Sequence, residues 1–400
     1  MMGAYRDLLR IPGVVNVTAS QLCARLPLGL LSLAILLHVQ GSTDSYALAG
    51  AVVASVGVGE AVAMPVTARL AARTGAARTL MIAAVINAMS TLGLAFTGAT
   101  APLLVGLGLL AGLSMPPLMP VVRALYPRMV GPDEVRTLFA LDTTAQELIW
   151  VIGPVAATFL ASAVNTACPL ILCAAVTLLG TGWFLVGSRH IHPAKSSIAV
   201  SFGGVLRYRS VLLAMVACLA MVSSFTALEV AIIAALGNDG VLAGVAIASG
   251  SIGSLLGGLL LGHRRLGLSG LVAALMAVGF GIVLYGVADG LVLQFAAIFI
   301  SGVGFAPAMS ALYLMVSREI AEHVATEAFG WISSATIVGG AIGTAIAGIA
   351  TDAHGPRGAV VVSVAMAALA ALSPIIARAF GPLSGLAREP LAAKEVRMTS

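Results

Sequence analysis

Long apolar stretches separated by short polar breaks recur along the whole chain. A helix needs about 20 mostly apolar residues to cross the hydrocarbon core of a bilayer, and these stretches are close to that length. Cutting the sequence at clusters of charged residues, Gly, Pro, Asn and Asp predicts an all-α membrane protein with twelve transmembrane helices. The predicted helices span residues 14–39, 46–71, 79–97, 101–126, 138–162, 166–187, 211–236, 241–262, 267–288, 290–317, 328–351 and 357–380.

The longest polar break divides these predicted helices six and six. The other connections are short, so successive helices are expected to be antiparallel neighbours. We therefore predict an N-terminal six-helix bundle over residues 1–187 and a cytoplasmic linker over residues 188–210. The remainder, residues 211–400, is predicted to be a C-terminal six-helix bundle that ends in a short cytoplasmic tail.

The two halves of the sequence also resemble each other. Residues 50–59 of the second predicted helix share Gly, Ala, Ser and Gly with residues 244–253 of the eighth, at an offset of 194. Matching runs link the fourth helix with the tenth and the fifth with the eleventh, at an offset of 190. Such repeats are typical of transporters built from duplicated halves, so we expect the two bundles to be pseudo-symmetric.

Charge is scarce and falls on one side of the predicted membrane. Only 9% of the residues are charged and 60% are apolar, whereas a soluble domain carries about 25% charged residues. If the N-terminus is cytoplasmic, all 21 Lys and Arg residues face the cytoplasm except Arg25, within a helix, and Arg357, outside. The positive-inside rule therefore predicts cytoplasmic termini in the cell (inner) membrane.

The N-terminus carries Arg6 and Arg10 ahead of an apolar stretch, as a secretory signal does. The apolar stretch that follows is too long and too polar for a signal core. We therefore expect an uncleaved first helix.

Several kinds of chemistry lack support in the sequence. The basic residues are scattered over short loops, which argues against a nucleic-acid partner. The four cysteines have no metal-ligand spacing, and His190 with His192 is more simply interpreted as part of a solvated loop, so we expect no metal and no cofactor. The sequence contains no HExxH motif, paired His/Asp cluster or phosphate-binding Gly loop, which argues against a membrane enzyme or sensor with catalytic residues.

A few polar side chains lie within the predicted helices. An ionisable group at the bilayer centre costs about 2.5 to 3.5 kcal/mol, so each one needs a partner or a watery cavity. The candidates for proton coupling or for the cavity wall are Arg25, Glu60, Glu147 and Glu229. The candidates for contact with a substrate are Gln21, Gln146, Trp150 and Thr336.

Arg25 requires an anionic partner inside the membrane. Gln21 and Arg25 are four residues apart and share one helical face. We expect Arg25 to pair with Glu60 or Glu147 beside a central cavity, where the carboxylate could exchange protons. The alternative is a structural pair that only joins helices.

Two further charged residues lie near the predicted cytoplasmic ends of their helices. Arg123 and Asp142 are interpreted either as an inner-gate salt bridge or as solvated interfacial residues. For Glu229, nearer the outer side, a structural role and a transport role both stay open.

Two motifs resemble those of the major facilitator superfamily. Its motif Gly-x-Leu-x-Asp-Arg-x-Gly-Arg-Arg has a counterpart after the second predicted helix, where Leu70, Arg73 and Gly75 keep their places and Ala72 replaces the acid. Gly153 and Pro154 in the fifth helix resemble the start of the Gly-Pro-x-x-Gly-Gly element of proton-coupled drug exporters. Its last two glycines are Ala157 and Thr158 here, and the arginine usual in the fourth helix of such exporters is Gly108.

The resemblance covers the whole chain and implies the drug or metabolite proton-antiporter branch of this superfamily. We therefore expect a monomeric secondary transporter that exports small amphipathic compounds in exchange for protons by alternating access. The alternative is an uptake permease for a small metabolite, which would need more polar side chains around its cavity than this sequence provides.

Overall fold

The computed structural model describes residues 2–96, 100–132, 134–191, 202–236, 240–262 and 266–379. All regular structure in these ranges is helical, and it includes twelve spans that are long and apolar enough to cross a membrane. The prediction of an all-α protein with twelve membrane spans is therefore confirmed.

The helices follow one another with short connections, as the sequence predicted. The first half contains α1 (Met2–Arg10), α2 (Val14–Arg25), α3 (Pro27–Thr43), α4 (Tyr46–Thr74), α5 (Ala76–Phe96), α6 (Ala101–Leu113), α7 (Leu118–Met129), α8 (Glu134–Ala163) and α9 (Cys168–Gly187). The second half contains the short 3-10 helix η1 (Gly204–Arg207), α10 (Arg209–Leu236), α11 (Gly240–Leu261), α12 (Leu268–Val287), α13 (Leu291–Glu319), α14 (Glu322–His354) and α15 (Pro356–Ala379).

Two of the spans consist of two helices each. The first span breaks between α2 and α3 at Pro27, and the fourth breaks between α6 and α7 at Pro116 and Pro117. Proline has no backbone N–H and its ring collides with the preceding turn, so it ends or bends a helix. Pro65 and Pro154, in contrast, lie inside the continuous helices α4 and α8.

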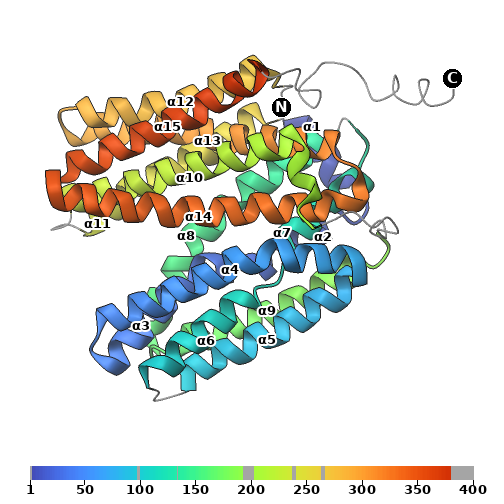
Figure 1. The fold of residues 1–400 in the computed structure, drawn as a ribbon, viewed down its shortest axis with the longest axis horizontal. Helices are drawn as coiled ribbons and strands as arrows, with labels where there is room; N and C mark the ends of the chain where they lie inside the picture. Colours follow the sequence, from blue (N-terminus) through green and yellow to red (C-terminus); the bar gives the residue numbers. More distant parts are fainter. Residues whose placement is uncertain are drawn as a thin grey trace.

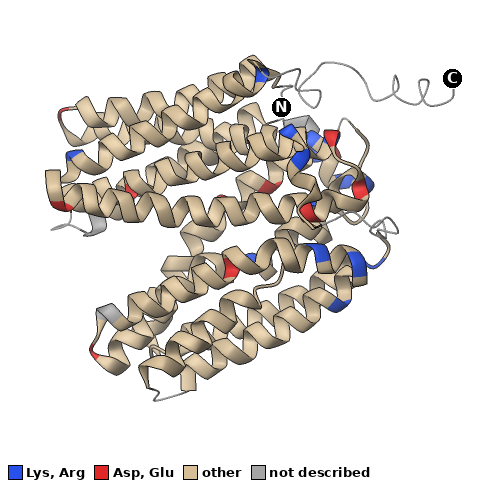
Figure 2. Cartoon of the chain, in the orientation of Figure 1, with Lys and Arg blue, Asp and Glu red and all other residues tan. Residues whose placement is uncertain are grey.

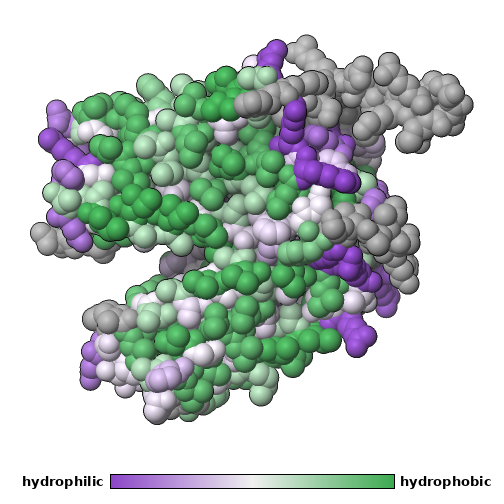
Figure 3. Space-filling view, viewed as in Figure 1, coloured by the Kyte–Doolittle hydropathy of each residue, from purple (hydrophilic) through white to green (hydrophobic). Residues whose placement is uncertain are grey.

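The helices form two groups that meet at one end and diverge at the other (Figure 1). One group contains α3, α4, α5, α6 and α9, and the other contains α10 to α15. The space-filling view shows an open cleft between the groups at the left of the picture (Figure 3). The predicted domain boundaries agree with this division but stay predictions, and residues 192–201 of the linker and 380–400 of the tail lie outside the described residues.

Lys and Arg residues gather where the two groups meet, opposite the open mouth of the cleft (Figure 2). We call this the Arg-rich end; the helix ends found there carry Arg73, Arg128, Arg209, Arg318 and Arg378. Large apolar side chains are exposed along the outer surface between the two ends (Figure 3). Such a surface is stable in contact with lipid and not with water.

Candidate functional site

A cluster of charged and amide side chains is buried where α2, α7 and α8 meet. Arg25 Nη1 donates to Asp142 Oδ1 at 2.6 Å, and Arg123 Nε donates to Asp142 Oδ2 at 3.2 Å. Arg25 and Arg123 are each 2% exposed and Asp142 is 0% exposed. We call Arg25, Arg123, Asp142, Gln21 and Gln146 the central cluster.

The two glutamines complete the central cluster. Gln21 Nε2 donates to Asp142 at 3.0 Å, and Gln21 Oε1 accepts from Arg25 at 2.6 Å. Gln146 Oε1 accepts from Arg25 Nη2 and, at 3.4 Å, from Arg123 Nη2. The pairs Gln21 with Arg25 and Asp142 with Gln146 are each one helical turn apart, so each pair presents both side chains on one face.

The predicted partner of Arg25 was wrong. Arg25 pairs with Asp142 and with neither Glu60 nor Glu147. Asp142 and Arg123 do form the predicted salt bridge, but both are buried, which corrects the interpretation that they are solvated interfacial residues.

Arg123 also connects the two groups of helices. Its guanidinium lies over the ring of Tyr313 of α13, with 3.7 Å between the guanidinium carbon and the ring centroid. Tyr313 belongs to a buried aromatic group with Phe139 of α8 and Phe329 of α14. A desolvated cation over an aromatic face is stabilised by about 2 kcal/mol or more. The bottom of the cleft is therefore closed by contacts between the halves.

Glu147 of α8 faces the second half of the chain. Its carboxylate accepts a hydrogen bond of 2.9 Å from the hydroxyl of Ser254 on α11. Glu229 lies on α10 and is partly exposed. One turn away, the backbone at Gly258 approaches Thr144 so closely that a Cβ on Gly258 would collide with the Thr144 hydroxyl. Ser254 was not predicted from the sequence, since a serine in a Gly-rich helix carries no signal of its own.

Glu60 of α4 lines a hollow that Arg25 also lines. The other lining residues come from α2, α3, α4, α7, α9 and the break before α7, and most of them are apolar: Ala24, Leu28, Met64, Met115, Pro116, Leu118, Met119 and Thr177. Glu60 is partly exposed. Within the described ranges it makes no hydrogen bond and no ion pair.

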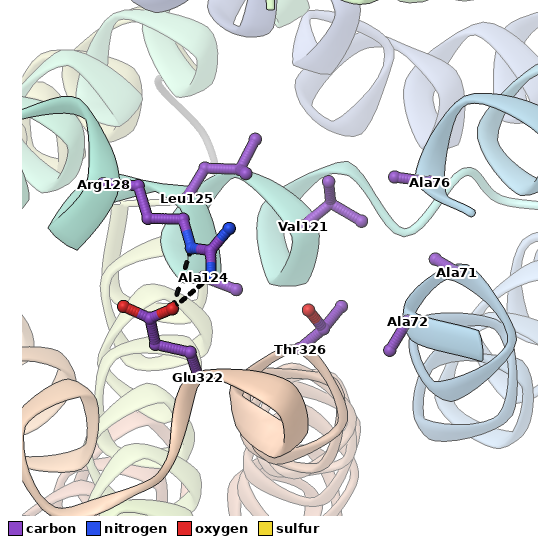
Figure 4. Close-up of a pocket in the computed structure, with 9 residues that line it drawn as sticks. All are labelled: Ala71, Ala72, Ala76, Val121, Ala124, Leu125, Arg128, Glu322 and Thr326. Carbon is purple, nitrogen blue, oxygen red and sulfur yellow. Dashed lines mark hydrogen bonds and ion pairs between the residues drawn. The ribbon is translucent and has the colours of Figure 1, made fainter. Parts of the chain in front are cut away.

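Ion pairs between the halves close the Arg-rich end. Arg69 of α4 donates to Glu327 of α14 at 3.1 Å. Arg128 Nε of α7 donates to Glu322 of α14 at 2.8 Å (Figure 4). These pairs were not predicted from the sequence. The available signal was the presence of two acids, Glu322 and Glu327, at an end otherwise rich in arginine.

The end of the linker takes part in this closure. The backbone N–H of Gly203 donates to Glu327 Oε1 at 2.8 Å. The ring of Phe202 lies 5.6 Å from the ring of Trp331 of α14 and 5.5 Å from the guanidinium carbon of Arg69. We call Arg69, Glu327, Phe202, Gly203 and Trp331 the linker latch.

Helix α1 contacts the second half at the same end. Tyr5 donates from its hydroxyl to the carbonyl oxygen of Gly258 on α11 at 3.0 Å. Burial raises the pKa of Tyr5 to about 12, so this hydroxyl stays protonated and remains a donor at physiological pH.

The superfamily-like loop forms a tight turn between α4 and α5. Gly75 has φ +103°, a conformation that L side chains rarely adopt, and Arg73 is exposed. Ala72 lies with Ala71 and Ala76 on one side of a small pocket between α4, α7 and α14 (Figure 4). The position where the motif usually has an acid therefore contributes only a methyl group to this pocket.

Gly153 marks the crossing of α8 with α3. A Cβ at Gly153 would lie 2.5 Å from the backbone of Gly29, so the two helices are in backbone contact there. Pro154 lies next to this contact and is partly buried. The motif that resembled an exporter element thus forms a close helix crossing.

The remaining substrate candidates are not brought into the central cluster. Trp150 is 51% exposed on α8. Thr336 on α14 donates its hydroxyl to the carbonyl oxygen of Ile332 in its own helix. Among the described residues no group of three His, Cys, Asp or Glu side chains is arranged to hold a metal ion, and His192 lies outside them.

Comparison with known proteins agrees with this architecture. The family model of the Major Facilitator Superfamily matches residues 17–335. No curated protein matches the sequence.

Several solved transporters share the fold. A bacterial homologue of the iron transporter ferroportin in an outward-facing state is 16% identical, with a TM-score of 0.76 over 92% of this chain and 99% of that one. The human organic anion transporter MFSD10 is 14% identical, with a TM-score of 0.72 over 93% and 99% of the two chains. The E. coli fucose:proton symporter is 15% identical, with a TM-score of 0.70 over 92% and 99%.

Proposed function

The chain belongs to the major facilitator superfamily, and from this premise we propose that it exports small amphipathic compounds across the cell membrane in exchange for protons. The fold is that of a transporter and not of an enzyme. The observation that carries the proposal for proton exchange is the hydrogen bond between Glu147 and Ser254, which joins the two halves through a titratable group.

Alternating access requires that the closed end opens while the open end closes. In the present state the cleft is open at one end (Figure 3). The other end is held by the linker latch and by the pair of Arg128 with Glu322, which Figure 4 shows. We propose that the Arg-rich end is cytoplasmic, in agreement with the positive-inside rule, so this state faces outward. Transporters of this architecture rock one half against the other around a fixed site.

Proton binding at Glu147 would favour opening of the Arg-rich end. A hydrogen bond to an ionised carboxylate is roughly twice as strong as one to a neutral group. Protonation of Glu147 therefore weakens its contact with Ser254, which is present only while α8 and α11 are close together. Protons entering from the outside would thus drive the change to an inward-open state that loads the exported compound.

The composition of the cleft supports an amphipathic cargo. A sugar permease binds its substrate with many hydrogen bonds, because each unpaired polar group in such a site would cost affinity. Here the amides of Gln21 and Gln146 are already occupied by Arg25 and Asp142. The uptake of a small metabolite remains the alternative, and one of the similar structures is a fucose:proton symporter.

Purified protein in lipid vesicles tests this proposal. The membrane potential is clamped at zero by potassium and valinomycin. Vesicles with an acidic interior should then accumulate ethidium through those copies whose Arg-rich end faces the outside of the vesicle. Nigericin, which dissipates the pH gradient, should abolish the accumulation. Glu147→Gln should lose gradient-driven accumulation and keep exchange of labelled for unlabelled ethidium. Glu134→Gln, at the start of the same helix, is the control.

Two results would contradict the proposal. Accumulation in vesicles with an alkaline interior would show symport, and accumulation that is indifferent to the pH gradient would show that protons are not coupled. We further propose that the working unit is a monomer, with the lipid bilayer and the substrate as its partners.

A further inference from the structure

Helix α1 is attached to the first half of the molecule by an apolar contact. It packs on α2 and α8, and Leu8 on its inner side is 0% exposed and belongs to the apolar core. Arg6, Leu9 and Arg10 are exposed on the other side of the helix. Gly13, at φ +87°, forms the turn into α2, a conformation that L side chains rarely adopt. The position of α1 is therefore fixed with respect to the first half.

The inner side of α1 also reaches the second half, through Tyr5. Tyr5 and Leu8 are three residues apart, so their side chains lie on one side of the helix. The Tyr5 hydroxyl donates to the carbonyl oxygen of Gly258 on α11 at 3.0 Å in a partly buried bond. The same carbonyl oxygen accepts from the backbone N–H of Gly262 at 2.9 Å. Because a carbonyl oxygen has two lone pairs, the bond from Tyr5 can form and break while α11 stays intact.

This bond lies at the crossing of α8 with α11, where the two halves are in contact. Ser254, Gly258 and Gly262 follow one another at intervals of about one helical turn, so they share one edge of α11. A Cβ on Gly258 would collide with Thr144 of α8, and a Cβ on Gly262 would collide with Ala140. Such close packing of two helices from different halves requires that the Arg-rich end is closed.

We propose that α1 is an arm of the first half that holds α11 and thereby keeps the Arg-rich end closed. When the halves separate at this end, α1 moves with α2 and α8, and the bond between Tyr5 and Gly258 breaks. Water that enters the open end then becomes the partner of the hydroxyl. The inference concerns the equilibrium between the closed and the open state, so it does not depend on which compound or ion is transported.

The expected effect follows from the loss of this one bond. A hydrogen bond between neutral groups changes an equilibrium by about twofold to tenfold. Tyr5→Phe removes the hydroxyl and keeps the ring, so we expect the population that is open at this end to rise by that factor. Leu8→Ser removes the apolar contact of α1 with the first half, and it should raise the open population at least as much.

The reaction of a buried cysteine with N-ethylmaleimide measures the open population of the full-length protein in lipid nanodiscs. The reporter is Thr144→Cys in a background without the native cysteines, because Thr144 is 4% exposed at the crossing and becomes accessible when the halves separate. Tyr5→Phe should accelerate the reaction about twofold to tenfold. Tyr208→Phe is the matched control, since this tyrosine precedes α10 at the same end and its hydroxyl makes no hydrogen bond among the described residues.

A second reporter separates opening from unfolding. Native Cys173 is 2% exposed and packs within the first half, so in a protein that lacks the other three cysteines it reacts only on unfolding. Its rate should be the same with Tyr5 and with Phe at that position. The inference fails if Tyr5→Phe leaves the rate at Thr144→Cys unchanged, if Tyr208→Phe accelerates it equally, or if Tyr5→Phe accelerates both reporters to the same extent.

Discussion

Asp142 is the shared carboxylate partner of two arginines inside the membrane, Arg25 and Arg123. Replacing it by asparagine leaves two buried cations with no counter-charge. Removing one partner of a buried ion pair typically costs about 3–5 kcal/mol. We therefore expect Asp142→Asn to lower the melting temperature of the detergent-solubilised protein strongly. A fluorescent dye that reports unfolding and does not react with the four free cysteines measures this temperature.

The adjacent Thr143 provides the control for this prediction. Its hydroxyl donates only to carbonyl oxygens of its own helix, at Phe139 and Ala140. Thr143→Val should therefore leave the melting temperature nearly unchanged. If Asp142→Asn has the same melting temperature as Thr143→Val, the central cluster does not stabilise the fold.

At this scale the sequence predicted which residues matter better than it predicted their partners. Arg25, Gln21 and Gln146 were all identified, because polar groups stand out in apolar helices. The partner was missed because a sequence does not show which face of a helix points inward. Positions 142 and 147 are about 140° apart around α8, so only one of them can face Arg25. The face of Asp142 does so.

The crossing of α3 with α8 depends on two glycines in backbone contact, Gly29 and Gly153. Gly153→Ala would place a methyl group 2.5 Å from the Gly29 backbone. Because backbone atoms cannot move aside as a flexible side chain does, we expect a loss of about 1–3 kcal/mol, seen as a lower melting temperature. Gly57→Ala in α4 meets open space and is the control, with no loss expected. Equal stability of both variants would show that the crossing is looser than described.

The linker latch predicts how the Arg-rich end opens. Arg69→Gln removes the ion pair with Glu327 and the contact with Phe202. A hydrogen bond to a charged group contributes about 1.5–3 kcal/mol, and each 1.4 kcal/mol is a tenfold change in an equilibrium. We expect the population that is open at this end to rise about tenfold.

Spin labels on α4 and α14, with distances measured by pulsed electron resonance, report this population. Arg78→Gln is the control, since Arg78 is an exposed arginine at the start of α5. An unchanged distance distribution in Arg69→Gln would exclude the latch as a determinant of closure.

Elements were predicted well from the sequence where hydrophobicity alone decides them. The predicted span 211–236 and the observed α10 differ by two residues at one end. The eleventh span was placed at 328–351, whereas α14 begins at Glu322. The reason is that Glu322 and Glu327 look like loop residues in the sequence, although their partners on the other half of the molecule hold them in the helix.

The orientation of the whole molecule can be tested with single cysteines in a background without the four native ones. Ser42→Cys lies at the end of α3, near the mouth of the cleft, and Arg189→Cys lies just after α9. In intact cells a membrane-impermeant maleimide should label only the first, because we predict that the Arg-rich end is cytoplasmic. Labelling of the second without permeabilisation would reverse the orientation and the direction of export.

The twelve spans and the arginine asymmetry followed from the sequence, because both reflect the lipid environment. The state of the molecule did not follow. A transporter sequence encodes at least two arrangements of nearly equal free energy, and only the structure shows which one has Arg69 paired with Glu327.

The position of Arg123 has a mechanical consequence. It is bonded to Asp142 within the first half and rests on the ring of Tyr313 in the second. When the halves rock, the contact of the guanidinium with the ring of Tyr313 must change, whereas the ion pair with Asp142 lies within one half and can be kept. Arg123 therefore stays with the first half during rocking, and its contact with the second half is the one that changes.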